Sequence, residues 1–85
     1  MEEDSRRLKA TILEVVENQL RDGDPPETRE TLERLIDEGV SEEDARLLLG
    51  QAVTVEVYCI WKEKTPFNRE RFVRNLRNLP AQPYE

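Results

Sequence analysis

The sequence predicts an all-α fold in which four helices form two helical hairpins, with small orthogonal or bundle-like packing. Three observations lead to this prediction. Apolar residues recur at intervals of three and four along most of the chain, which is the spacing of one helix face. Proline, glycine and capping residues separate these stretches. No segment offers a partner for a β-strand, which would leave its backbone groups unpaired.

Length and composition predict one domain over residues 1–85 with a thin core. The chain is 36% hydrophobic and 38% charged, whereas ordinary domains have about 45–50% apolar and about 25% charged residues. A chain of this size lies near the lower limit for folding without a disulfide or a metal. A partner surface that completes the core is therefore expected.

The charge balance argues against two classes of partner. The net charge of −6 repels nucleic acid and anionic membranes, because their binding depends on Lys and Arg that neutralise phosphate. The first residues show neither a basic start nor an apolar run typical of a signal peptide, and the single cysteine, Cys59, cannot form an internal disulfide. We therefore expect a cytoplasmic protein with no nucleic-acid or membrane partner.

The first two helices are separated by a proline-containing loop. The first helix is expected over about residues 5–21, and the second begins near Pro25 and ends near Glu38. Asp24 is placed as the N-cap of the second helix, with Glu27 completing a capping box. The apolar faces comprise Leu8, Ile12, Val16 and Leu20 in the first helix, and Leu32, Leu35 and Ile36 in the second.

A glycine turn leads to the third helix. Gly39 suits the left-handed conformation of a Schellman cap, with Val40 packing back on Leu35. Ser41 is the expected N-cap of a helix over about residues 42–64, with Asp44 at the capping-box position.

Residues 52–58 alternate with a period of two and are rich in β-branched side chains, which favours a strand. We favour a helix because no partner strand exists, and an intermolecular sheet is the alternative.

The fourth helix follows a break at Thr65-Pro66. Asn68 is its expected N-cap, and Phe67 and Phe72 occupy the positions of a hydrophobic staple. Pro80 ends the helix. Residues 1–4 and 80–85 are expected to be disordered. The basic residues of residues 62–85 are expected to attract the acidic remainder of the chain.

No enzyme signature is present, so we lean towards a non-enzymatic protein without a cofactor. The chain has no histidine, hence a serine or cysteine nucleophile would lack its usual base. One cysteine cannot build a zinc site, and no glycine-rich phosphate loop occurs. Cys59 falls on an apolar helix face and is interpreted as a core residue.

Glu56 is the polar residue that stands out. It falls in the middle of the apolar side formed by residues 45–60 of the third helix, where a carboxylate must be paired or bound to an ion. One interpretation is a structural pair with an arginine such as Arg34 or Arg74. The alternative is a polar pocket of Glu17, Gln19 and Glu56 that binds a small ligand, or a metal through Glu17 and Glu56.

The third helix is apolar on its other side as well, which predicts self-association. Val57, Tyr58 and Trp61 are the candidate interface, and a homodimer is the expected partner state, with a second protein as a further candidate. Nucleic-acid binding is the least favoured alternative; it would use Lys62, Lys64, Arg69, Arg71, Arg74 and Arg77.

The chain also resembles an uncharacterised family of small bacterial helical proteins, a domain of unknown function. The resemblance covers most of the chain from about residue 12 and lies in residues 16–19, 24–31, 38–39, 56 and 66–71. It implies a helical fold and carries no activity. Members of that family have a His-Glu-x-x-His pair at the start of the third helix, where this chain has Glu43, Asp44 and Leu47. Leu47 has no ligating atom, which puts an inherited metal site in doubt.

Overall fold

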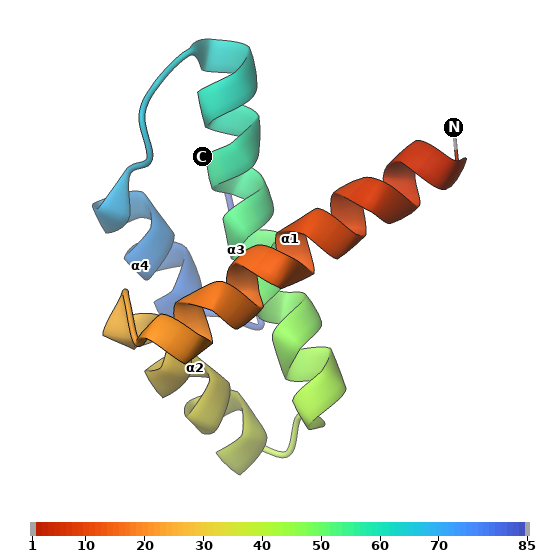
Figure 1. Cartoon of the computed structure of the whole chain (residues 1–85). Helices are drawn as coiled ribbons and strands as arrows, with labels where there is room; N and C mark the ends of the chain where they lie inside the picture. The colour runs from red at the N-terminus through yellow and green to blue at the C-terminus, as the bar shows by residue number, and fades with distance from the viewer. Residues whose placement is uncertain (1, 85) are drawn as a thin grey trace.

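Four helices packed together form the protein. The computed structural model describes residues 2–84, and side chains for residues 6–84. The helices are α1 (Glu2–Asp22), α2 (Pro26–Asp37), α3 (Glu42–Glu63) and α4 (Arg69–Asn78) (Figure 1). The all-α prediction is confirmed, and residues 52–58 are helical, with no strand in the described range. None of the helices in this range is long and apolar enough to cross a bilayer.

The central helix is α3, which contacts each of the other three helices. The pair α1–α2 packs against it, and α4 lies against α2 and α3 without approaching α1. In Figure 1, α1 crosses α3 near its middle, so that the first turns of α1 and the last turns of α3 both extend beyond the crossing. Gly50 lies at this crossing, because a Cβ at that position would be 3.3 Å from Ile12 Cγ2.

The core fills the space where α1, α2 and α4 meet α3. Most of its members belong to the predicted helix faces, and Cys59 is buried as expected. The core cluster comprises Ile12, Val16, Leu20, Leu32, Leu35, Ala45, Leu49, Ala52, Val53, Phe72, Leu76 and Leu79.

Three predicted core residues are nevertheless exposed. Leu8, Ile36 and Ile60 have between two fifths and about half of their surface in contact with solvent. Leu8 and Ile60 belong to the parts of α1 and α3 that extend beyond the crossing, and Ile36 lies in the last turn of α2. The helical period placed these residues on an apolar face correctly, but no neighbouring helix covers them fully; Leu8 lies at the edge of the space between α1 and α3.

The cap of α3 and the cap of α4 are confirmed. Ser41 Oγ accepts a hydrogen bond from the Asp44 N–H (3.1 Å), and Asn68 Oδ1 accepts one from the Arg71 N–H (2.9 Å). The rings of Phe67 and Phe72 lie 5.4 Å apart, as the predicted staple requires.

The glycine turn between α2 and α3 is also confirmed. Gly39 has a φ of 98°, and the Val40 N–H donates to the Leu35 carbonyl at 3.0 Å. This bond is the long-range bond of a Schellman motif.

The prediction for the start of α2 was wrong. Pro25, not Asp24, is the N-cap residue, and no side chain caps the helix. Pro26 is the first helical residue, one position later than expected. The Glu27 carboxylate accepts a hydrogen bond from Arg69 at 3.1 Å instead of serving a capping box. The two consecutive prolines shift the start of the helix because either of them suits its first position.

The structure describes most of both chain ends. Residues 2–4 belong to α1, and residues 80–84, expected to be disordered, lie back along α4. Residues 1 and 85 lie outside the described residues.

Candidate interaction surface

The last turns of α3 carry an exposed apolar strip, defined here as Val57, Ile60 and Trp61. Their exposed fractions are 37%, 45% and 73%. Residues three and four apart are neighbours on a helix surface, so Val57 adjoins both Ile60 and Trp61. Val57 and Trp61 were predicted as interface residues. Ile60 was missed because the sequence placed it on the buried side, although its position three residues after Val57 was a usable signal.

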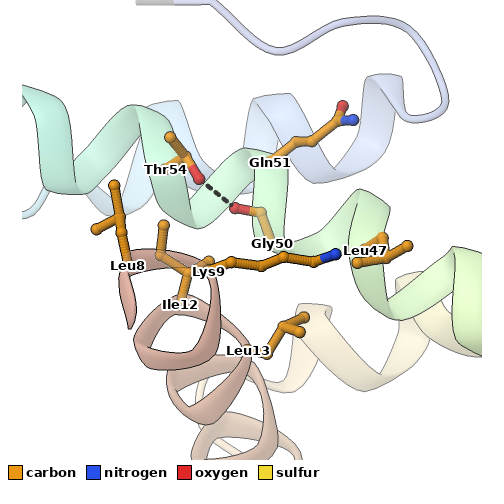
Figure 2. Close-up of a pocket in the computed structure, with 8 residues that line it drawn as sticks. All are labelled: Leu8, Lys9, Ile12, Leu13, Leu47, Gly50, Gln51 and Thr54. Atoms are coloured by element: carbon orange, nitrogen blue, oxygen red, sulfur yellow. Dashed lines mark hydrogen bonds between the residues drawn. The ribbon is translucent and has the colours of Figure 1, made fainter. Parts of the chain in front are cut away.

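The apolar strip is open because α1 crosses α3 about two to three turns before it. The crossing occurs at Gly50, and beyond it α1 and α3 diverge (Figure 1). Next to the crossing, α1 and α3 line a surface hollow of about 430 Å³. Its lining is mostly apolar and comprises Leu8, Lys9, Ile12, Leu13, Leu47, Gly50, Gln51 and Thr54 (Figure 2).

Thr54 lines the hollow and lies three residues before Val57 of the apolar strip. The Thr54 hydroxyl donates to the Gly50 carbonyl (2.8 Å), which satisfies the polar group within α3. In Figure 2, the Lys9 side chain is extended past Gly50 towards Leu47, so its aliphatic part forms one wall of the hollow. A long apolar stem with a charged end covers apolar surface without desolvating the charge.

Tyr58, the third predicted interface residue, lies on a neighbouring side of α3. It lines a separate hollow with Val55, Pro83 and Tyr84. The Lys62 ammonium lies 5.5 Å from the centre of its ring. Tyr58 lies three residues before Trp61 and therefore adjoins the apolar strip on one side, while its other side faces the C-terminal segment.

Glu56 forms a buried ion pair with Arg71. Only 2% of Glu56 is exposed. Its Oε2 accepts from Arg71 Nε at 2.6 Å, and its Oε1 accepts from Arg71 Nη2 and from the Asn68 N–H, both at 2.9 Å. The hydrogen bond with Glu56 raises the pKa of the Arg71 guanidinium, although burial opposes the shift. The carboxylate therefore joins α3 to the start of α4.

The arginines expected to pair with Glu56 have other roles. Arg34 donates to the Leu76 and Leu79 carbonyls, each at 3.0 Å, and so binds the end of α4 to α2. Arg74 contacts the C-terminal segment. The prediction of a structural pair was right in kind, but the partner is Arg71. Arg71 follows the N-cap Asn68 by three residues, so the turn that starts α4 brings its side chain to Glu56.

Each residue of the predicted polar pocket finds a different protein partner. Glu17 pairs with Arg46 of α3, and Gln19 Oε1 accepts from the Thr28 hydroxyl of α2 at 3.0 Å. A hydrogen bond with Glu42 and the nearby Glu17 raise the pKa of Arg46 against the effect of burial. Glu56 faces α4. Among residues 6–84, whose side chains are described, no three Cys, Asp or Glu side chains gather as a metal site.

Basic residues near α4 contact the acidic body of the protein, as the charge distribution predicted. Arg69 donates to Glu27 (3.1 Å) and lies 3.8 Å from Asp24. Arg71 is bound to Glu56. These guanidinium groups are engaged in contacts between elements of the fold.

Comparisons with protein-family models, curated proteins and solved structures gave no match. The resemblance to a family of small bacterial helical proteins stays a prediction.

Proposed function

We propose that this chain is a non-enzymatic helical interaction module that self-associates through the apolar strip of α3. One observation carries the proposal. Trp61 is 73% exposed and lies beside the exposed Val57 and Ile60, so three large apolar side chains share one uncovered helix face. Contiguous apolar patches of this kind mark protein–protein contact sites more often than single exposed residues do.

Self-association through the apolar strip needs no contribution from another protein. In a two-fold symmetric dimer, both copies use the same patch. Trp61 of one copy then contacts residues of the apolar strip of the other copy. Covering apolar surface contributes about 25 cal/mol per Å². Aromatic side chains bury about 150–250 Å² each and are frequent among the residues that dominate binding energy.

The charge of the chain opposes association and makes it dependent on salt. Each copy carries a net charge of −6, so two copies repel each other at low ionic strength. Salt screens this repulsion, with a Debye length of about 10 Å at 0.1 M. The apolar contact is not weakened in the same way. We therefore expect the dimer to become more stable as the salt concentration rises.

The non-enzymatic part of the proposal is supported by the chemistry of the chain. The sequence contains no histidine, and the buried carboxylate of Glu56 already accepts three hydrogen bonds from the protein. A carboxylate held in this way is a structural partner of Arg71.

Sedimentation velocity over a range of protein concentrations tests the proposal, with native mass spectrometry as a second measure of subunit number. The wild type is expected to form dimers, and Trp61→Glu or Ile60→Glu is expected to give monomers because each places a charge in the contact. The matched control is Ile36→Glu. Ile36 is exposed to a similar degree, 41% against 45% for Ile60, and lies in the last turn of α2.

The control should remain dimeric, and far-UV circular dichroism verifies that each variant is folded. A wild type that stays monomeric at the highest concentrations refutes the proposal. So does a Trp61→Glu variant with the same subunit number as the wild type.

A further inference from the structure

The C-terminal segment, residues 80–84, lies in a groove between α3 and α4. After the end of α4 the chain turns back and passes behind α3 in Figure 1. The Ala81 N–H still bonds to the Asn78 carbonyl (2.9 Å). The next bonds to the helices within the described residues are those of Tyr84, which reach Arg74 and Asn75. We call Arg74 and Asn75 the clasp.

Asn75 binds the backbone of Tyr84 through both ends of its amide. Its Nδ2 donates to the Tyr84 carbonyl at 2.9 Å, and its Oδ1 accepts from the Tyr84 N–H at 3.3 Å. A side-chain amide has one donor end and one acceptor end, like a peptide group. The Asn75 side chain is fully buried and therefore needs such partners. These two bonds recognise the backbone of an extended residue whatever its side chain.

Arg74 adds recognition of an aromatic side chain. Its Nη2 donates to the same Tyr84 carbonyl at 2.7 Å, and its guanidinium carbon lies 4.2 Å from the centre of the Tyr84 ring. A cation over an aromatic face is attracted electrostatically by the ring. Arg74 Nε is buried and has no hydrogen-bond partner among the described residues. The clasp therefore has one donor that the C-terminal segment leaves unused.

The C-terminal segment fills the groove only in part. One hollow of about 580 Å³ lies between Leu48, Gln51 and Val55 of α3 and the residues Pro80, Gln82 and Pro83. A second, of about 420 Å³, lies between Tyr58 and the last described residues. Tyr84 itself is more than half exposed. A ligand with larger side chains would find unfilled space between the present backbone path and α3.

We propose that the clasp and the adjoining groove are a binding site for an extended peptide of a partner protein that carries a proline–aromatic pair. Pro83 and Tyr84 of the same chain occupy this site in the structure. Proline before the aromatic residue holds the ligand extended and reduces the entropy that binding costs. The site is separate from the apolar strip, so the inference does not depend on self-association.

Because the C-terminal segment occupies the site, it competes with any free peptide that binds there. A tethered ligand acts at an effective concentration in the millimolar range when its linker is short. A free peptide must displace it and therefore binds the wild type weakly. Weakening the tethered segment while leaving Arg74 and Asn75 unchanged should increase the affinity for the free peptide.

Tyr84→Pro in the full chain is the variant that makes this test. It removes the N–H that Asn75 accepts and the ring that lies over Arg74. The probe is a fluorescein-labelled peptide with the sequence of residues 79–85, titrated by fluorescence anisotropy. The Tyr84→Pro variant is expected to bind it at least ten-fold more tightly than the wild type. A peptide with alanine in place of its tyrosine should lose this gain.

Arg74→Gln, added to Tyr84→Pro, serves as the site control because replacing Asn75 risks unfolding the core. Its affinity should return to the wild-type level or below. The Asn75 side-chain amide signal in a ¹⁵N NMR spectrum should shift in Tyr84→Pro and move back when the peptide is added. If a folded Tyr84→Pro variant binds the peptide no better than the wild type, the proposal is overturned. The same holds if the Asn75 signal does not respond to the peptide.

Discussion

Replacing Glu56 by glutamine isolates the contribution of the buried ion pair. Glutamine has nearly the same shape and keeps an oxygen that can accept from the Asn68 N–H. The same oxygen can accept from Arg71 Nη2, but the amide nitrogen would take the place of Oε2 and put N–H donors against the Nε donor of Arg71, which now lies 2.6 Å from the carboxylate. The substitution therefore removes one charge-assisted hydrogen bond, leaves the second without the charge of the carboxylate, and leaves the Arg71 charge without its partner.

The expected loss of unfolding free energy is about 3 kcal/mol. Hydrogen bonds to charged groups contribute about 1.5–3 kcal/mol each. Breaking a fully buried pair costs about 3–5 kcal/mol. The value lies at the lower end because 16% of the Arg71 side chain remains in contact with water, which partly solvates the unpaired charge. The free energy of unfolding of a small domain is about 0.05–0.15 kcal/mol per residue. A loss of about 3 kcal/mol is therefore a large part of the total stability.

Urea unfolding followed by far-UV circular dichroism measures the loss. The midpoint is expected to fall with little change in the slope of the transition. The matched control is Glu17→Gln, which makes the same chemical change in the Glu17–Arg46 pair, where 57% of the Glu17 side chain is exposed. Exposed pairs contribute about 0–1 kcal/mol, so this control should change little.

A double-mutant cycle with Arg71→Met should show that most of the loss is shared between the two residues. If Glu56→Gln costs no more than Glu17→Gln, the assignment of Glu56 as a structural partner is refuted. A Glu56→Gln variant of unchanged stability that loses a bound ligand or metal in native mass spectrometry would instead favour a binding pocket at Glu56.

Substitutions at four further positions test the local structure by the same unfolding assay. Asn68→Ala should cost about 1 kcal/mol because it removes the side-chain cap of α4, whereas Asp24→Ala should cost less than about 0.5 kcal/mol because Asp24 caps nothing; equal losses would contradict the caps described. Gly50→Ala should be nearly neutral, since a gain of about 1 kcal/mol in helix propensity offsets the 3.3 Å approach to Ile12. Gly50→Leu should cost about 1–3 kcal/mol by forcing α1 away from α3, and a neutral result would show that the crossing is loose. Gly39→Ala should cost about 1–2 kcal/mol because of the φ of 98°, and an unchanged midpoint would show that the turn tolerates a side chain.

The helices and most of their ends could be predicted because they depend on residues close together in the sequence. The cap of α3 at Ser41, the Schellman turn at Gly39 and the Phe67–Phe72 staple each involve residues no more than six positions apart. The start of α2 was misjudged within the same local range, because Asp24 and two prolines offered competing starts. Local chemistry limits the start of a helix to a few residues, but it does not always decide at which of these residues the helix begins.

The candidate site was predictable only in part. Val57 and Trp61 were found because an all-round apolar helix in a short chain must leave one face uncovered. Ile60 was missed because the period of a helix does not say where a neighbouring helix ends. The clasp was missed altogether, since it joins Arg74 and Asn75 of α4 to a segment expected to be disordered.

The sequence by itself determined that the chain is helical, where its helices begin and end to within a few residues, and that Glu56 would need a partner. Only the tertiary structure decided that the partner is Arg71, that Glu17 and Gln19 bind elsewhere, and that the apolar surface of α3 stays open past its crossing with α1. The physical reason is the range of the interactions. Helix formation and capping act over a few residues, whereas the burial of a side chain depends on which distant element crosses over it and how far that element extends.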